Sequence, residues 1–373
     1  MIYLDASATT LVKKSVMDEF MKVSTIAFAN PNSLHHAGLN AKTIIDDATN
    51  NIANNLNILP SEIIYTSGAS ESNNLAIKGI ALKNNAGKHI ITTRFEHPSV
   101  IGPLGWLQDQ GFEIDFVNTD QAGQVDLNHL RELLRSDTIL VTIASVNSEL
   151  GISQPIDKIG TILKDYPHLL FHVDLTQSIG KEALNLKQVD LASISAHKFG
   201  GIKGIGTLIK KQGVELEPLI HGGGSTTIYR SGTPAPALIA SLSIALTEAT
   251  KDLDEQITHV AEGNQYLRIK LSGYKQVTIN SPANAVPHIL NFSIVGVDPK
   301  QFQALLSEHE VYISVGTACN TGYEVSPSVL ALTGSEAIAS SSMRISLTSD
   351  ITKEQLNKFL KIFEVCYNEL VKE

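Results

Sequence analysis

Two neighbouring segments decide the fold class: LLFHVDLTQ (169–177) and DLASISAHKFGG (190–201). Each begins with a short apolar run and ends in polar side chains. Apolar residues at consecutive positions are typical of strands buried on both faces, because successive side chains point to opposite sides of a sheet. We therefore expect both segments to be central strands of a sheet that helices cover on both sides.

Five further runs of this kind lie between residues 62 and 216. They are EIIYT (62–66), HIITT (89–93), EIDFVN (113–118), TILVTIASV (138–146) and GTLIKK (206–211). Strands that alternate with helical stretches form crossover units around a mostly parallel sheet. The sequence thus predicts an α/β fold, whose large domain holds a mostly parallel seven-stranded sheet flanked by helices.

The pattern changes after about residue 240. A long helical region (236–272) leads to shorter strands and a helix, and a final helix carries apolar residues at helical spacing. The expected elements are strands near 276–281, 288–294, 311–316 and 343–347 and a helix at 300–310. We expect a large domain over 16–240 and a smaller α+β domain formed by 1–15 and 241–373.

The composition narrows the class of protein. The chain has 373 residues, a formal net charge of −9 and 43% hydrophobic residues. The negative charge disfavours nucleic acid as a ligand, and no apolar run approaches the ~20 residues that span a bilayer. Two cysteines form no disulfide framework, and the first residues, MIYLDASATT, do not resemble a leader. We expect a cytoplasmic protein without a membrane partner or a metal site.

Lys198 follows the second of the two strands and precedes a glycine-rich turn. A desolvated lysine at such a position loses its proton more easily, which makes it a competent amine for a Schiff base. Asp174 ends the first strand, where an acid can pair with a protonated ring nitrogen. Taken alone, each residue is more often an ordinary strand end or helix cap, so the interpretation depends on their combination.

Two other strands also end in polar residues. EIIYT is followed by SGASES (67–72), a turn and helix start whose backbone N–H groups suit a phosphate. Just past the next strand stands His97, which could stack on a ring and move protons. An ordinary helix cap and a structural histidine are the simpler alternatives for these two features.

Cys319 and Arg344 are the remaining candidates. Cys319 lies in a stretch rich in Gly, Thr and Asn, which predicts an exposed loop, and an exposed thiol suits a nucleophile. Cys366 lies beside the apolar face of the last helix, so we expect it in the core. Arg344 opens the last strand, and arginine binds carboxylates through paired hydrogen bonds.

Ten motifs occur along the chain in one order. They are YLDASATT (3–10), NPNSLHHAG (30–38), TSGASESNNLAIKG (66–79), EHPSV (96–100), VNSELG (146–151), HVDLTQSIGK (172–181), SAHKFGG (195–201), HGGG with RSGT (221–233), SVGTAC (314–319) and SSMRISL (341–347). In this order they resemble the class V aminotransferase branch of the pyridoxal-phosphate enzymes. More narrowly, they resemble the cysteine desulfurases of the nitrogen-fixation and iron–sulfur-cluster type.

The resemblance implies a fold-type I enzyme that binds pyridoxal 5'-phosphate. Lys198 would bind the cofactor covalently, Asp174 would pair with its pyridine nitrogen, and Gln177 would reach its phenolic oxygen. His97 would stack on the ring. The implied phosphate contacts are Ala69, Ser70, Ser195 and His197, with Thr233 reaching across the interface of a homodimer.

The implied reaction removes sulfur from L-cysteine and yields L-alanine. Lys198 and His97 would move protons, and Cys319 would hold the sulfur as a persulfide. Arg344 and Asn147 would bind the substrate. The persulfide would pass to a protein acceptor in iron–sulfur cluster assembly or tRNA thiolation.

Two alternatives stay open. One is a related lyase or transaminase of the same cofactor class, such as a selenocysteine lyase. The other is a cofactor-poor pseudoenzyme that serves as a partner protein. Cys319 favours the desulfurase, because a transaminase needs no thiol. Intact Lys198, Asp174 and His97 argue against the pseudoenzyme.

The chain departs from the family pattern in three places. Ser148 stands where the family usually has a second asparagine that contacts the cofactor, so we expect a weaker or water-mediated contact there. The segment 225–229 replaces the usual Glu-Arg after HGGG. The sequence printed here stops at Glu373, without the tail used for scaffold docking, from which we expect a restricted range of acceptors.

Overall fold

The computed structural model describes residues 1–224, 226–316 and 325–371. Its largest sheet, among these residues, has seven strands in the order β2-β8-β7-β6-β5-β3-β4. They are β2 (Ile63–Thr66), β3 (His89–Thr92), β4 (Glu113–Phe116), β5 (Thr138–Ala144), β6 (Leu170–Asp174), β7 (Leu191–Ser195) and β8 (Gly206–Lys210). Only β8 runs against its neighbours. The predicted mostly parallel seven-stranded sheet is confirmed.

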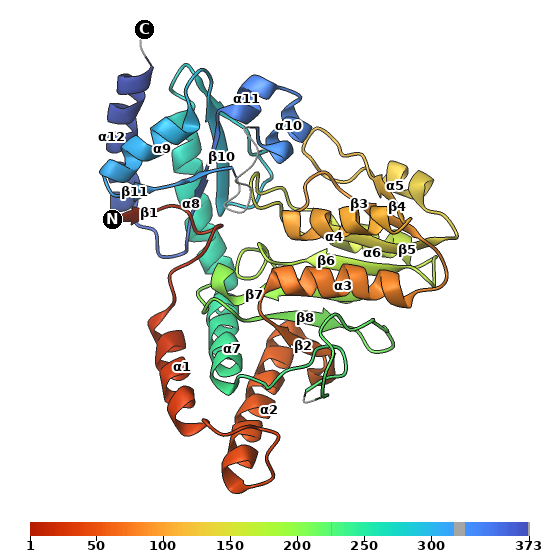
Figure 1. Cartoon of the computed structure of the whole chain (residues 1–373). Helices are drawn as coiled ribbons and strands as arrows, with labels where there is room; N and C mark the ends of the chain where they lie inside the picture. Colours follow the sequence, from red (N-terminus) through yellow and green to blue (C-terminus); the bar gives the residue numbers. More distant parts are fainter. Residues whose placement is uncertain (225, 317–324, 372–373) are drawn as a thin grey trace.

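Helices cover both faces of this sheet (Figure 1). Ile90 and Leu140 pack in the hydrophobic core on one face of the sheet. Ile91 and Val141 pack in the core on the other face. Consecutive apolar residues in these strands are thus explained by two separate cores. The covering helices are α3 (Ala69–Lys83) and α4 (Pro98–Asp109) on one face, and α2 (His36–Leu56), α6 (Ile156–Leu163) and α7 (Pro236–Thr250) on the other.

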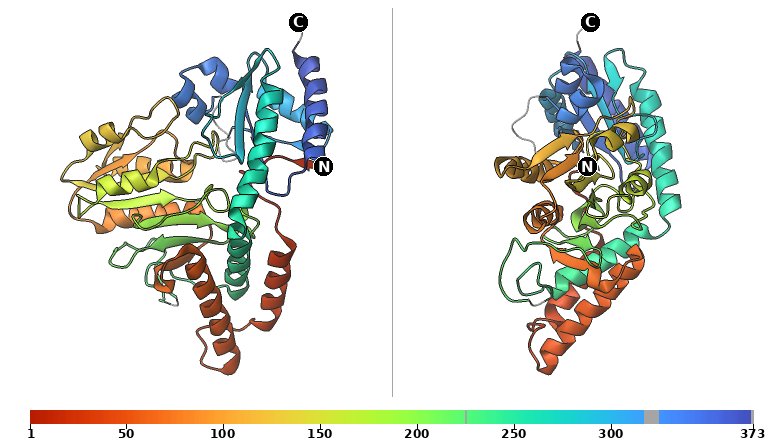
Figure 2. Two further views of the ribbon diagram at one scale, coloured as in Figure 1. Left: turned by 180° about the vertical axis from the view of Figure 1, so that it is seen from behind. Right: turned by 90° about the vertical axis from the view of Figure 1, so that its right-hand side faces the viewer.

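A four-stranded antiparallel sheet lies apart from the first, in the order β12-β13-β10-β9. Its strands are β9 (Val277–Ile279), β10 (Ile289–Ile294), β12 (Ser314–Val315) and β13 (Ser342–Ser346). Beside it, β1 (Ile2–Tyr3) pairs in parallel with β11 (Val311–Tyr312). In both figures α8 (Leu253–Leu271) runs from the region of α7 towards this second sheet (Figures 1 and 2).

The core of the second sheet is aromatic. α12 (Lys353–Leu370) buries Phe359 and Phe363, and the Phe363 ring meets those of Phe292 and Phe302 edge-on. Cys366 is buried in the same core, which confirms its predicted place. The remaining elements are α1 (Lys14–Ile26), α5 (Leu127–Leu133), α9 (Pro299–Glu308), α10 (Pro327–Thr333), α11 (Glu336–Ser340) and the short 3-10 turns η1 (Pro60–Glu62) and η2 (Ala196–Lys198).

The helical region expected over 236–272 is two helices. α7 ends at Thr250, and α8 starts at Leu253 after Asp252, whose φ of 51° lies in the left-handed region. A left-handed residue cannot continue an α-helix, so the chain changes direction there.

The N-terminal segment connects the two sheets. The Leu4 N–H bonds Tyr312 O, the Ser7 N–H bonds Ser346 Oγ, and the Thr10 N–H bonds His197 O beside Lys198. This path brings main-chain carbonyls of the first ten residues to the carboxyl end of β7. Among the described residues, no helix is both long and apolar enough to cross a membrane.

Candidate active site

A cavity of about 320 Å³ opens at the carboxyl ends of β2, β6 and β7. We call it the sheet-edge cavity, and its volume suits a small ligand or cofactor. Ten of the residues singled out in the sequence line it. They are Ala69, Ser70, His97, Ser148, Asp174, Gln177, Ser195, His197, Lys198 and Arg344. Strand ends at one edge of a parallel sheet bring together residues that are far apart in the chain.

Lys198 stands in η2, one turn beyond the buried strand β7. Its Nζ donates to Ser7 O at 2.7 Å and to Ala8 O at 2.9 Å. Both acceptors are main-chain carbonyls of the N-terminal segment. They hold the amine at the border of the cavity.

Asp174 ends β6, the neighbour of β7, and is buried. Its Oδ2 accepts from Asn73 Nδ2 at 2.8 Å and its Oδ1 from the Thr176 N–H at 2.9 Å. Within the described part of the chain, Asp174 forms no salt bridge with a lysine or arginine. A buried carboxylate is normally balanced by a positive charge, so this position suits a ligand with a protonated ring nitrogen.

His97 belongs to a chain of polar side chains that leads to Asp174. Its Nδ1 lies 2.8 Å from Ser99 Oγ and accepts from the Ser99 N–H, which caps α4. Ser99 Oγ in turn accepts from Asn73 Nδ2, the same amide that bonds Asp174. Because Nδ1 accepts, Nε2 carries the proton in the neutral ring. Burial lowers the pKa of His97, with Asp174 opposing and Lys198 adding to the shift.

The first turn of α3 lines one part of the cavity. Its N-cap is Gly68, which offers no side chain to the helix N–H groups of Ala69 and Ser70. Gly68 has φ of +153°, and a Cβ on the neighbouring Gly206 would lie 2.7 Å from the Gly68 Cα. Glycine at both positions therefore lets β8 pass close to the turn. Free N–H groups at a helix N-terminus bind anions.

Arg344 enters the cavity from the second sheet. It is 2% exposed, and its Nη2 donates to Asp5 Oδ1 at 2.9 Å while Nη1 donates to Ser148 O at 2.8 Å. The buried Nε has no partner among the described residues. Ser148, which lines the cavity, thus also contributes its carbonyl. The sequence interpretation missed Asp5, although it stands in the first quoted motif.

Gln177 is held from two sides. Its Nε2 donates to Ser7 O at 2.9 Å, and its Oε1 accepts from Lys181 Nζ at 2.5 Å. Burial, together with Lys198 and Arg344, lowers the pKa of Lys181 to about 7. His197, which lies 3.1 Å from Thr9 Oγ1, has its pKa lowered to about 4 by burial and nearby lysines, so it is neutral.

Two predicted residues do not line this cavity among the residues that the structure describes. Asn147 Nδ2 bonds Phe95 O and Ser328 Oγ, and its Oδ1 accepts two N–H groups, so its amide holds a loop. Thr233 is exposed and lies outside the lining. Cys319 falls outside the described residues. Substrate binding by Asn147 and the roles of Thr233 and Cys319 remain predictions.

A lysine just past β7 and a buried carboxylate at the end of β6, beside the N-terminus of α3, define the class of protein. It is an α/β protein with a ligand-sized cavity at the carboxyl edge of its sheet. Similar proteins of known family narrow this class to one family.

The Aminotransferase class-V family model matches residues 2–359. A cysteine desulfurase IscS of Dictyoglomus turgidum is 38% identical, over 97% of this chain and 93% of its own length. The mitochondrial cysteine desulfurase of Saccharomyces cerevisiae is 37% identical, over 96% of this chain and 73% of its own. The chain therefore belongs to the class-V aminotransferase family and, within it, to the cysteine desulfurases.

Solved structures agree with this placement. A NifS-like protein superposes with a TM-score of 0.92 and 34% identity, covering 98% of both chains. A structure described as SspA in complex with cysteine gives a TM-score of 0.83 at 34% identity, covering 94% of this chain and 99% of its own. The predicted family and fold class are both confirmed.

Proposed function

We propose that this chain binds pyridoxal phosphate in the sheet-edge cavity and removes sulfur from L-cysteine, leaving L-alanine and a persulfide on Cys319. The observation that carries the proposal is the convergence of Lys198, Asp174 and the open N-terminus of α3 in one cavity. Relatives named as cysteine desulfurases, and a similar structure described as bound to cysteine, support the choice of substrate.

The residues present fit this cofactor. Asp174 would hold the protonated pyridine nitrogen, because it is a buried carboxylate without a cationic partner among the described residues. The N–H groups of Ala69 and Ser70, with Ser195 and His197, would hold the phosphate. Lys198 would carry the cofactor as a Schiff base. When bound, pyridoxal phosphate supplies an electron sink for the charge that develops at the substrate α-carbon.

Arg344 and Lys198 act on the two ends of the amino acid. The guanidinium of Arg344 borders the cavity with its Nε unpartnered, so it can bind the substrate carboxylate. Lys198 Nζ takes the proton from the α-carbon and later returns one. His97 carries its proton on Nε2, because Ser99 occupies Nδ1, and so it can protonate a group within the cavity.

Cys319 accepts the sulfur. Its thiolate attacks the sulfur of the bound cysteine, so an S–S bond forms and the C–S bond breaks. The electron pair of the broken bond returns to carbon, which takes up a proton and leaves as L-alanine. The persulfide then passes to a protein acceptor. We further propose a homodimer in which Thr233, exposed here, completes the phosphate site of the partner subunit.

Borohydride reduction of the purified protein tests the cofactor assignment. We expect a pyridoxyl label on the peptide that contains Lys198 and none in Lys198→Ala. Lys203→Ala is the matched control, because Lys203 also lines the cavity and should leave the label in place. A label on any other lysine would contradict the proposal. Sedimentation of the unlabelled protein tests the dimer separately.

A further inference from the structure

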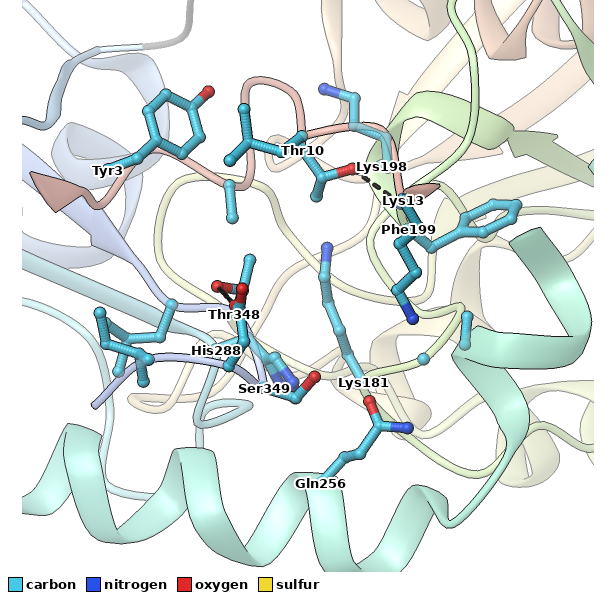
Figure 3. Close-up of a pocket in the computed structure, with 18 of the residues that line it drawn as sticks. Tyr3, Thr10, Lys13, Lys181, Lys198, Phe199, Gln256, His288, Thr348 and Ser349 are labelled. Atoms are coloured by element: carbon cyan, nitrogen blue, oxygen red, sulfur yellow. Dashed lines mark hydrogen bonds between the residues drawn. The ribbon is translucent and has the colours of Figure 1, made fainter. Parts of the chain in front are cut away.

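A second cavity has a volume of about 530 Å³, larger than that of the sheet-edge cavity, and Figure 3 shows residues that line it. We call it the rear cavity. Lys198 lines both cavities, so they meet at this side chain. Thr10 and Lys13 of the N-terminal segment, Gln256 of α8 and Thr348 after β13 form its walls. None of the roles described above uses this space.

Lys181 extends into the rear cavity (Figure 3). It is 6% exposed, and among the described residues its ammonium group donates to Gln177 Oε1. A lysine ammonium has three donors, so two remain for another acceptor. Within the described residues, no carboxylate forms a salt bridge with Lys181. The neighbouring Glu182 bonds Ser145 and Ser153 instead.

His288 lines the same cavity and is 4% exposed. Its Nδ1 has no hydrogen-bond partner among the described residues. Burial and the charge of Lys181 lower the pKa of His288 to about 3, so the ring is neutral and has one N–H. Buried polar atoms in proteins almost always have a partner, and an unpartnered ring on the wall of a cavity indicates a missing ligand atom.

The other charged residues that line the rear cavity have partners. Lys13 forms an ion pair with Glu248 at 3.4 Å, and the Met1 ammonium forms one with Glu310 at 3.5 Å. Lys198 donates to Ser7 O and Ala8 O, and Asp350 accepts from Thr348 Oγ1. The walls also include apolar side chains, among them Ile179, Phe199, Leu347 and Ile351. A ligand that fits must therefore combine one anionic oxygen group with a short apolar part.

We propose that the rear cavity binds a small aliphatic carboxylate, whose oxygens accept from Lys181 Nζ and the ring N–H of His288. The aliphatic part lies against the apolar walls. The bound charge also stabilises the protonated form of Lys181, which is otherwise opposed by burial, Lys198 and Arg344 and favoured by Glu182. Binding therefore takes up a proton above pH about 7 and takes up none well below it.

Titration of the cofactor-loaded protein with butyrate, followed by ligand-observed NMR, tests this site. Butyramide is the neutral probe of the same shape. We expect butyramide to bind roughly tenfold more weakly, because it cannot form the charge-assisted bonds. The affinity for butyrate should fall above pH about 7, and that for butyramide should not. Equal affinities for the two probes would overturn the proposal.

Variants locate the bound probe. Lys181→Met should weaken butyrate binding roughly tenfold or more. Lys210→Met is the matched control, because Lys210 is also a buried lysine but bonds Val214 O away from the cavity, and it should bind butyrate normally. If Lys181→Met does not fold, His288→Leu decides the question, with an expected severalfold loss. If Arg344→Lys weakens butyrate binding while Lys181→Met and His288→Leu do not, butyrate lies in the sheet-edge cavity and the proposal is overturned.

Discussion

At the carboxyl edge of the seven-stranded sheet the buried side chains are polar and bond one another, whereas between the four-stranded sheet and α12 they are aromatic. At the sheet edge, the Asn73 side chain links Ser99 to Asp174 by hydrogen bonds. Beside α12, the Phe363 ring packs edge-on against the rings of Phe292 and Phe302. Burial of polar groups adds little net stability, because each has lost its bonds to water. Burial of phenyl rings stabilises directly.

The comparison separates two consequences of mutation. Changes at the sheet edge should alter cofactor binding or turnover while the protein stays folded. Changes in the aromatic core should lower the free energy of unfolding while the folded fraction keeps its cofactor. Arg344 belongs to both regions. Its strand, β13, packs in the aromatic core, and the Arg344 guanidinium borders the sheet-edge cavity.

The two cysteines give the sharpest contrast. Cys319→Ser should reduce L-alanine formation to near zero, because a serine hydroxyl has a much higher pKa and little affinity for sulfur. The cofactor spectrum should still change when cysteine is added. Cys366→Ser, in the aromatic core, should cost about 1 kcal/mol of stability and leave sulfur transfer intact. Alanine assays and persulfide mass measurements on both variants check this. Normal alanine formation by Cys319→Ser would favour a direct β-elimination lyase.

Phe363→Ala should have the largest effect on stability. Its ring is fully buried and contacts the rings of Phe302 and Phe359. Truncation leaves a cavity and should lower the free energy of unfolding by about 3–5 kcal/mol. Urea denaturation measures the loss. Val365→Ala on the same helix is the control, because Val365 is exposed and should change little. A similar loss in both variants would contradict the comparison.

Asn73→Ala should weaken cofactor binding with a smaller effect. The change removes the amide that bonds the Asp174 carboxylate, and bonds to charged groups contribute about 1.5–3 kcal/mol. We expect the dissociation constant for pyridoxal phosphate, measured by absorbance titration, to rise roughly tenfold. Asn74→Ala is the matched control, because the Asn74 amide bonds Ser70 O at the exposed surface. Unchanged binding in Asn73→Ala would show that the link to Asp174 is dispensable.

Ser148→Asn should have the smallest effect and the opposite sign. Ser148 lines the sheet-edge cavity, and an amide there would restore the contact that the family usually makes. A neutral hydrogen bond contributes about 0.5–1.5 kcal/mol, so cofactor affinity should rise severalfold. Ser148→Ala serves as the reference. If Asn and Ala behave alike, the side chain at this position does not reach the cofactor.

The strands of the large sheet were predictable because their signal is local. TILVTIA (138–144) is apolar or small at nearly every position, and its apolar side chains divide between the two cores. The polar residues at the strand ends were predictable for the same reason, since Asp174 and Lys198 each follow a buried run. The break between α7 and α8 was missed, because no glycine or proline marks the turn at Asp252.

The bonds that position the site could not be predicted in this way. The Arg344–Asp5 pair joins residues 339 positions apart, and Lys198 bonds carbonyls of Ser7 and Ala8. Carbonyls carry no sequence signature, because every residue has one. The use of the Ser148 carbonyl and of the Asn147 amide in the loop was hidden for the same reason.

The sequence by itself determined the type and order of the elements of the large sheet and the residue types at its carboxyl edge, because side-chain periodicity and strand ends are local properties. It also determined the family, through ten motifs in one order. Only the tertiary structure decided which of those residues share a cavity, what holds Lys198 and Arg344 in place, and that Lys181 and His288 face a second cavity. These features depend on contacts between distant segments, and such contacts form only when the N-terminal segment and the second sheet pack against the first.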